Sequence, residues 1–214
     1  MATRPVPPSR LYRRRPWREA PLAALDFETT GLDLRRDAIV SFGVVPVQGG
    51  RVVLGGSTYS EVAPAAPLSP GAIAVHELRP VDLANAPQLD QARMALATAL
   101  DRRYVLAWVA EVETAFLARL YRMPRWAWRR RTIDVARLWL ALERIEGRSP
   151  SRAVSLVVAC NRHGVPVESA HDALNDAAMT AQLFLVIAAK LGRYPGYGRL
   201  VDLLRENGRH PYDV

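Results

Sequence analysis

The chain has 214 residues, yet it contains one cysteine, one lysine and no apolar run that approaches the length of a membrane span. The single cysteine, Cys160, excludes an internal disulfide and fits a reducing compartment. It lies in an apolar stretch, where we expect a buried structural thiol rather than a reactive one. With neither a spanning run nor a signal-peptide pattern, the sequence predicts a soluble, cytoplasmic protein that has no membrane partner.

Because Lys190 is the only lysine, nearly all of the positive charge is carried by arginine. Lys and Arg together number 29 against 21 Asp and Glu, which gives a net charge of +8 and a pI near 10.3. A basic balance favours a polyanionic partner, with nucleic acid as the first candidate. Arginine also suits bidentate contacts with phosphate. The coding bias of a GC-rich genome would produce the same arginine excess, so composition alone does not decide.

The composition divides the chain into three parts. Residues 1–20 are rich in proline and arginine, and we predict a disordered or extended tail that either grips phosphates or serves as a solvated linker. Residues 21–192 should form the folded domain, since half of the chain is hydrophobic and can build a core. Residues 193–214 form a C-terminal extension, with one short helix expected near 198–206.

Apolar periodicity predicts an α/β fold. Two strands joined by a Gly-Gly hairpin come first, and helices then alternate with strands, which favours a mixed sheet with helices on its faces. The expected strands cover 21–27, 38–47, 51–54 and 104–109, with 57–62 at a sheet edge, and 132–134 is either a short strand end or a helix entry. The expected helices cover 72–76, 88–101, 111–122, 135–145, 151–162 and 172–191.

The most informative stretch is a short apolar strand that ends in two acids, Asp26 and Glu28, separated by one residue. Strand side chains alternate between faces, so the two carboxylates point the same way. They repel each other and favour a cation between them, and oxygen ligands suit a hard divalent ion. The alternative is an acidic strand end followed by a Thr-Thr-Gly turn.

A second acidic group, His171, Asp172 and Asp176, opens the last and most apolar of the long predicted helices. Asp172 can cap this helix, so capping does not require Asp176. A carboxylate on a mostly apolar helix is costly to bury unless it is paired or binds metal. The alternative is a surface cap followed by a solvated aspartate.

Taken together, these motifs resemble those of the DEDDh 3′–5′ exonucleases of the ribonuclease H-like superfamily. Residues 26–31, DFETTG, are similar to the first motif, and residues 171–177, HDALNDA, match the third, a His followed after four residues by Asp. The helix expected over 156–164, which ends in Gly164, and the segment 73–78, IAVHEL, also match the family. All of these segments occur in the family's order, over roughly residues 21–191. The resemblance implies a mixed five-stranded sheet with helices on both faces, and it extends to the proofreading epsilon subunit of bacterial DNA polymerase III.

The second motif departs from the family pattern. Where the family has His-Asn after an apolar residue and Ala, this chain has Trp108 and Val109. Aligning the following Phe-Leu pair places Glu113 at the position of the usual aspartate, with Glu111 as a less suitable stand-in on another side of the helix. The alternative for Glu113 is a solvated acid in the first helical turn, where it favours the helix dipole.

The resemblance implies a two-metal phosphodiesterase that uses Mg²⁺ or Mn²⁺. Asp26 would bridge both ions, Glu28 and Asp176 would bind the ion that activates water, and Glu113 would hold the second ion. His171 would accept the proton of the attacking water, and a nucleoside monophosphate would leave. The residues implied to bind the terminal nucleotide are Thr29, Thr30, Gly31, Leu32, His76 and Leu78.

These motifs support an active exonuclease on the 3′ ends of single-stranded DNA, with a DNA polymerase as the further partner that the resemblance implies. The same chemistry serves RNA, and no residue settles the choice of sugar. The altered second motif supports an alternative, a nucleic-acid-binding or polymerase-associated module with weakened catalysis. The basic-aromatic run 122–131 either stacks bases or packs its tryptophans on the domain. Asp134, after this run, is expected to cap a helix rather than to bind a metal ion.

Overall fold

The fold, seen in a computed structural model, is described over residues 4–31, 33–149, 154–168 and 171–208. Its centre is one mixed sheet in the order β3-β2-β1-β5-β6, with β4 also paired to β2. Because β3 and β4 pair with different parts of β2, they share one edge, and the sheet has the five positions that we predicted. The strands are β1 (Leu22–Thr29), β2 (Ile39–Gln48), β3 (Arg51–Val52), β4 (Thr58–Glu61), β5 (Tyr104–Ala107) and β6 (Thr132–Asp134).

The directions in which the strands pair agree with the predicted hairpin and with the predicted mixed sheet. β1 is antiparallel to β2 and parallel to β5, and β5 is parallel to β6. Parallel neighbours place the ends of their strands, and the helices that follow them, at the same edge of the sheet. The carboxyl ends of β1 and β5 therefore lie at one edge.

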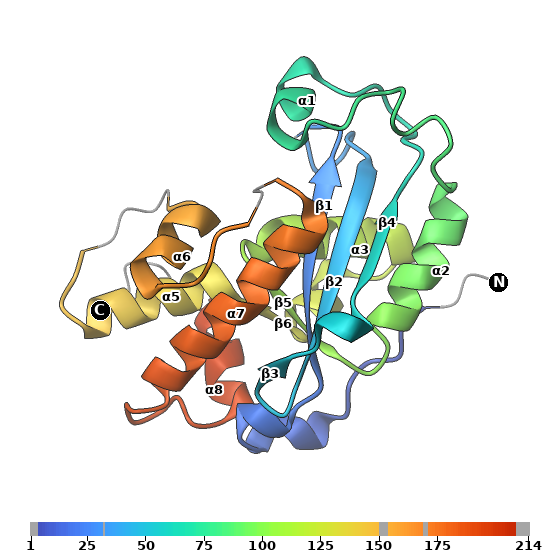
Figure 1. The fold of residues 1–214 in the computed structure, drawn as a ribbon. Coiled ribbons are helices and arrows are strands. Elements are labelled where there is room, and N and C mark those ends of the chain that lie inside the picture. Colours follow the sequence, from blue (N-terminus) through green and yellow to red (C-terminus); the bar gives the residue numbers. More distant parts are fainter. Residues whose placement is uncertain (1–3, 32, 150–153, 169–170, 209–214) are drawn as a thin grey trace.

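Helices cover both faces of the sheet, as the resemblance implied (Figure 1). One face carries α5 (Val135–Ile145), α6 (Leu156–His163), α7 (Ala173–Leu191) and α8 (Leu200–Arg205). The other face carries α2 (Leu89–Ala99), α3 (Ala110–Tyr121) and α4 (Arg125–Arg129). The remaining elements are α1 (Pro70–His76) and the short 3-10 helices η1 (Arg10–Arg14), η2 (Trp17–Glu19), η3 (Leu54–Gly56) and η4 (Glu206–Gly208).

The alternation of side chains along β1 decides which acids can meet. Leu22 and Ala24 belong to the core under α7, whereas Ala23 and Leu25 belong to the core under α2 and α3. Since side chains repeat every two residues, Asp26 lies on the α7 side of the sheet together with Glu28. The face that receives the two carboxylates is therefore the face on which α7 begins.

The N-terminal segment differs from the extended tail that we predicted. Residues 4–20 contain η1 and η2, and Trp17 is only 2% exposed. Its ring meets that of Phe184 on α7 edge to face at 5.2 Å between centroids, and Pro16 bridges to Arg199. The prediction was wrong because average composition hides single apolar anchors, and burial of one tryptophan stabilises a chain considerably.

Several element ends also differ from expectation. β5 ends at Ala107 rather than at 109, and α4 forms within the run 122–131, where we expected no helix. α6 begins at Leu156 rather than at 151, because the side chain of Ser155 accepts a hydrogen bond from the Val158 amide and caps it. Residues 151–153 lie outside the described part of the chain.

Helix α7 differs from the expectation that no apolar run approaches the length of a membrane span. The helix has 19 residues, and an 18-residue window of it reaches a mean hydropathy of 1.2, so by length and composition alone it could cross a membrane. Half of this stretch is buried, and α7 lies against β1 and β2 (Figure 1). The apolar composition of α7 is accounted for by its place in the core.

Candidate active site

Asp26 and Glu28 occupy the last part of β1 and face the start of α7. Asp26 pairs with Gly43 of β2, and Glu28 pairs with Ser41. A Cβ atom on Gly43 would lie 2.2 Å from the carbonyl oxygen of Ala173, the first residue of α7. This strand glycine therefore permits the helix backbone to approach the sheet directly beside Asp26.

The start of α7 brings Asp176 to the same place. Asp172 caps the helix, as predicted, because its side chain accepts hydrogen bonds from the amides of Leu174 (3.0 Å) and Asn175 (2.9 Å). Asp176 is therefore not needed as a cap. Its Oδ1 atom is buried and has no hydrogen-bond partner among the described residues.

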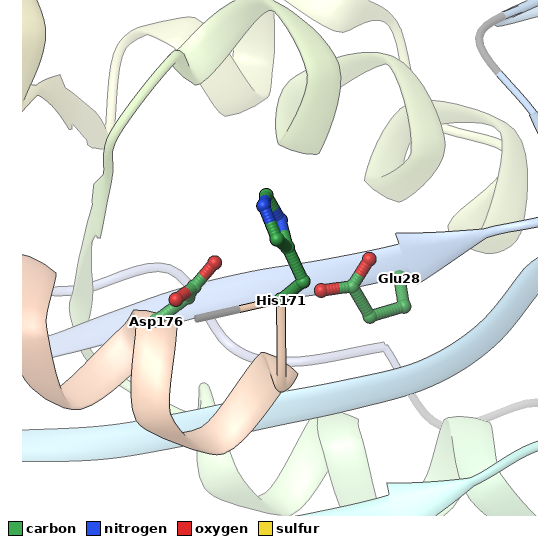
Figure 2. A group of neighbouring side chains, drawn as sticks. All are labelled: Glu28, His171 and Asp176. Atoms are coloured by element: carbon green, nitrogen blue, oxygen red, sulfur yellow. The ribbon is translucent and has the colours of Figure 1, made fainter. Parts of the chain in front are cut away.

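His171 lies just before this helix and completes a cluster with two of the acids. One side-chain ligand atom from each of Glu28, His171 and Asp176 lies within 4.8 Å of the other two. Figure 2 shows the three side chains, which come from β1 and from the start of α7, gathered beside one another. His171 is exposed and has a positive φ of 64°, so it sits in a turn that directs the chain into α7.

The fourth carboxylate comes from α3. Glu113 is only 4% exposed, its Oε2 atom has no partner among the described residues, and its charge acts on Asp26. Glu111 is instead exposed, and its carboxylate pairs with the guanidinium of Arg125 at 3.1 Å. The structure thus places Glu113 rather than Glu111 beside the cluster, and it disagrees with the alternative of a solvated Glu113.

Burial and nearby acids raise the pKa values of the four carboxylates. Burial, followed by the charges of Glu113, Glu28 and Asp176, raises the pKa of Asp26 well above its ordinary value. Burial and the charge of Asp176 raise the pKa of Glu28 to about 7, and burial raises that of Glu113 to about 8. Burial also raises the pKa of Asp176. Crowded acids of this kind are destabilising when ionised unless a cation lies among them.

Among the described residues, arginine does not supply that cation. In the described ranges, no Lys or Arg forms an ion pair with Asp26, Glu28, Glu113 or Asp176. The buried Glu143, in contrast, pairs with Arg148 and with Arg162. Clustered acids without basic partners, two of them with a buried oxygen that makes no hydrogen bond, fit divalent metal ions.

A cleft of about 190 Å³ opens beside the cluster. His76 and Leu78, both predicted to contact a terminal nucleotide, line it together with Glu28 and His171. The Nδ1 atom of His76 accepts a hydrogen bond from the Leu78 amide at 3.1 Å, whereas its buried Nε2 has no partner in the described structure. The cleft therefore places the imidazole of His76 on the same wall as Glu28 and His171.

The Thr-Thr-Gly turn after β1 supports the site through its side chains. The Thr29 hydroxyl donates to the carbonyl of Gly31 at 2.7 Å. The buried Thr30 hydroxyl donates to Asp37 at 2.8 Å and accepts from the Ala38 amide at 3.0 Å. These bonds hold the turn, so contact of Thr29, Thr30 and Gly31 with a nucleotide stays a prediction. Leu32 lies outside the described residues.

Four residues that line the cleft escaped prediction, and only the fold reveals them: Ser41 on β2, Tyr59 on β4, Val75 on α1 and Glu77 at the end of α1. Gly43 carried a usable signal, since a glycine inside a β-rich run often marks a close backbone approach. Trp108 lies after β5 rather than within it, half-buried against the core. Asp134 caps α5 as expected and accepts from the Arg137 amide at 3.0 Å.

Comparison with known families identifies the arrangement. The family model RNase_T, described as Exonuclease, matches residues 23–184. Two curated sequences named DNA polymerase III PolC-type, from Thermotoga maritima and Thermotoga petrophila, are each 29% identical to the chain over 78% of its length. The match spans only 12% of each of those proteins, so the chain corresponds to a small part of them.

Solved structures share the fold. E. coli Exonuclease I in complex with a dT13 oligonucleotide superposes with a TM-score of 0.68 at 18% identity, covering 81% of this chain and 42% of that one. Exonuclease X in complex with 5′ overhanging duplex DNA gives 0.59 at 22% identity, covering 85% and 99%. Cell-death related nuclease 4 gives 0.66 at 16% identity, covering 78% and 63%.

Proposed function

The chain belongs to the exonuclease family of the DEDD type, and we propose that it is a metal-dependent 3′–5′ exonuclease that shortens single-stranded DNA. One observation carries the proposal. Four carboxylates from β1, α3 and α7 converge, and none is neutralised by an arginine or lysine of the described chain. Such a set fits the divalent ions that phosphodiester hydrolysis requires.

Asp26, Glu28, Glu113 and Asp176 would hold Mg²⁺ or Mn²⁺, most simply as two ions. When bound, such ions polarise the phosphodiester and lower the pKa of water. The family resemblance assigns the positions, and the unpartnered oxygens of Glu113 and Asp176 support it. Glutamate in place of aspartate at 113 reaches one methylene further from α3.

His171 would accept the proton of the attacking water. Its exposed position in the turn before α7 leaves the ring accessible, and the ring lies within reach of Glu28 and Asp176. The water oxygen forms a new bond to the terminal phosphorus while the bond to the 3′ oxygen of the preceding nucleotide breaks. That oxygen is then protonated, and a nucleoside 5′-monophosphate leaves.

The cleft beside the cluster would receive the terminal nucleotide. His76 and Leu78 line the cleft, so the imidazole would lie beside the sugar or phosphate, and Leu78 would offer an apolar surface to the sugar or base. Single-stranded DNA is the substrate we favour, since E. coli Exonuclease I has been solved with a dT13 oligonucleotide. Parallel digestion of DNA and RNA of one sequence decides between the two sugars.

A direct test uses a 5′-labelled single-stranded oligonucleotide. With Mg²⁺ or Mn²⁺, we expect a ladder that shortens from the 3′ end, and chelator should stop it. The Asp26→Ala variant should give no ladder while keeping the fold, as judged by circular dichroism. A variant that degrades DNA at the wild-type rate would show that the activity is a contaminant or that the site is misassigned.

A second candidate function is a polymerase-associated module with weakened catalysis. Trp108 and Val109 in the second motif favour it, and so does the similarity to segments of two PolC-type polymerases. The same assay separates the two candidates, since a module would bind the oligonucleotide without shortening it. We favour the enzyme because Glu113 still brings a buried carboxylate to the cluster.

A further inference from the structure

A second cleft, of about 490 Å³, lies between the N-terminal segment and α4. Four arginines line it, two from each side, and no Asp or Glu of the described chain does so. The cleft therefore carries a concentrated positive charge in a protein that is already basic. The lining residues are Pro7, Pro8, Arg10, Arg13, Tyr104, Trp126, Ala127, Arg130 and Arg131.

One of these arginines is built into the domain. Arg131 is only 4% exposed, donates to the carbonyl of Leu100 at 3.0 Å, and lies 4.4 Å from the ring centroid of Trp128. Its buried Nε has no hydrogen-bond partner in the described structure, and neither does that of Arg13. Burial lowers the pKa of Arg131 to about 10, since the surroundings do not fully compensate its charge.

The cleft arginines also form no close ion pair with the described acids, although the charge of Asp101 acts on Arg131. Arg10, Arg13, Arg130 and Arg131 form no ion pair with a carboxylate in the described ranges, although many other arginines of the chain do. Unpaired guanidinium groups around an open cavity attract an external anion. Several phosphates at regular spacing suit four arginines better than one phosphate does.

An exposed aromatic ring lies at the same cleft. Trp126 is 58% exposed, unlike its neighbour Trp128, which is fully buried. The guanidinium of Arg130 lies 4.9 Å from the centroid of the Trp126 ring. Thus the run 122–131 uses one tryptophan for the core and leaves the other beside the arginines. A tryptophan next to cationic groups is the arrangement that binds single strands by stacking and charge.

This cleft is separate from the candidate active site. Tyr104, which lines it, pairs with Leu22 at the beginning of β1, whereas Glu28 lies six positions further along that strand. At about 3.3 Å per residue the two places are roughly 20 Å apart. One wall, from Pro7 to Arg13, also precedes the family match at 23–184, so this chain adds that wall to the shared domain.

We propose that this cleft is a second binding site for single-stranded nucleic acid. Arg10, Arg13 and Arg130 hold phosphates, the buried Arg131 adds positive charge, and Trp126 stacks on a base. The choice of nucleic acid among polyanions rests on the proposed function. A strand that reaches both sites spans at least about six nucleotides at roughly 3.4 Å each. Longer substrates should therefore bind more tightly than short ones.

The test measures binding of 5′-fluorescein dT20 to the full chain carrying Asp26→Ala, in chelator, by anisotropy at several salt concentrations. The Arg10→Ala/Arg130→Ala double variant removes two exposed charges from the cleft. Arg144→Ala/Arg193→Ala, which removes two exposed charges elsewhere, is the matched control. We expect the cleft variant to bind dT20 about tenfold more weakly, and its log Kd against log salt slope to fall by about 1.4.

Trp126 supplies an independent readout. Trp126→Ala should weaken binding of dT20 fivefold or more through lost stacking, and Trp126→Phe should restore most of it. In otherwise wild-type protein with Mg²⁺, the cleft variants should raise KM for dT20 and leave the turnover of dT4 unchanged. All variants should keep the parent's melting temperature, since the altered side chains are exposed.

The proposal is overturned if the cleft variants and the control bind dT20 within twofold of each other with equal salt slopes. This outcome, together with an intact 3′ ladder, would leave the proposed exonuclease standing without the second site. The opposite pattern, weaker binding by the cleft variants but no ladder from the wild type, would support the second site and reject the proposed exonuclease.

Discussion

Ala173, the first residue of α7, lies against the backbone of Gly43 so closely that a Cβ atom at 43 would sit 2.2 Å from the Ala173 carbonyl oxygen. Gly43 pairs with Asp26, and Ala173 lies three residues before Asp176. The absence of a side chain at one strand position therefore sets how near the acids of β1 and α7 come to each other.

Gly43→Ala should push the start of α7 away from the sheet and displace Asp176 and His171. We expect at least a tenfold loss of exonuclease rate and a destabilisation of about 1–3 kcal/mol from overpacking. Initial rates and thermal denaturation measure the two effects. Gly55→Ala is the control, since nothing lies within 4 Å of a Cβ at that position. A Gly43→Ala variant as active and stable as Gly55→Ala would contradict this role.

Glu113 and Glu111 should respond very differently to loss of charge. Glu113→Gln removes an unpartnered buried carboxylate and should slow hydrolysis by about 100-fold, in line with the several kcal/mol that metal ions contribute. Glu111→Gln alters only an exposed pair with Arg125 and should stay within about twofold of wild type. Single-turnover rates on a labelled oligonucleotide compare them. Equal effects, or a larger effect at Glu111, would reverse the assignment of the second motif.

The free energy of unfolding should contain a contribution from the crowded acids that decreases as pH rises. In chelator, Glu28 and Glu113 have pKa values of about 7 and about 8 in the folded protein, against an ordinary 4.5. The unfolded chain thus loses these protons at lower pH than the folded protein does. Their contribution to stability is therefore present below about pH 4.5 and is lost as pH rises through 7 to 8.

Mg²⁺ should reverse this loss because it binds the ionised acids. The rise in melting temperature on adding Mg²⁺ should be larger at pH 8 than at pH 5.5. Differential scanning fluorimetry at the two pH values checks it, with Glu113→Gln expected to reduce the difference. A Mg²⁺ effect that is equal at both pH values would argue against metal binding by these carboxylates.

Much of the site could be predicted from sequence because its parts are local. Period-two alternation alone places Asp26 and Glu28 on one face, and the capping chemistry of Asp172 leaves Asp176 unexplained and hence notable. That these segments meet came from resemblance to a family, since no local pattern joins β1 to α7. The same is true of Glu113, which only the aligned Phe-Leu pair distinguished from Glu111.

The parts that could not be predicted depend on distant contacts. Trp17 packs against Phe184 of α7, which lies far away in the chain. Because composition does not show such a contact, it predicted a tail for this segment. The arginine cleft exists only because that segment packs beside α4. In contrast, two features have local signals in the sequence. Ser155 is a helix-capping residue before α6, and Gly43 is a glycine within a β-rich run.

The buried anchor of the N-terminal segment can be tested by one substitution. Trp17→Ala should cost about 3–5 kcal/mol, because it empties a large buried site against Phe184. Leu11→Ala, at a side chain that is 75% exposed in the same segment, should change the free energy of unfolding by less than about 0.5 kcal/mol. Urea denaturation compares them. Equal stabilities would restore the prediction of a solvated tail.

The central claim is that acids from β1, α3 and α7 bind divalent ions together. Anomalous scattering from a crystal soaked in Mn²⁺ tests it most directly. We expect manganese peaks among Asp26, Glu28, Glu113 and Asp176, about 3.5–4 Å apart if two ions bind. Four carboxylates that gather as described but show no manganese, or manganese bound elsewhere only, would contradict the account.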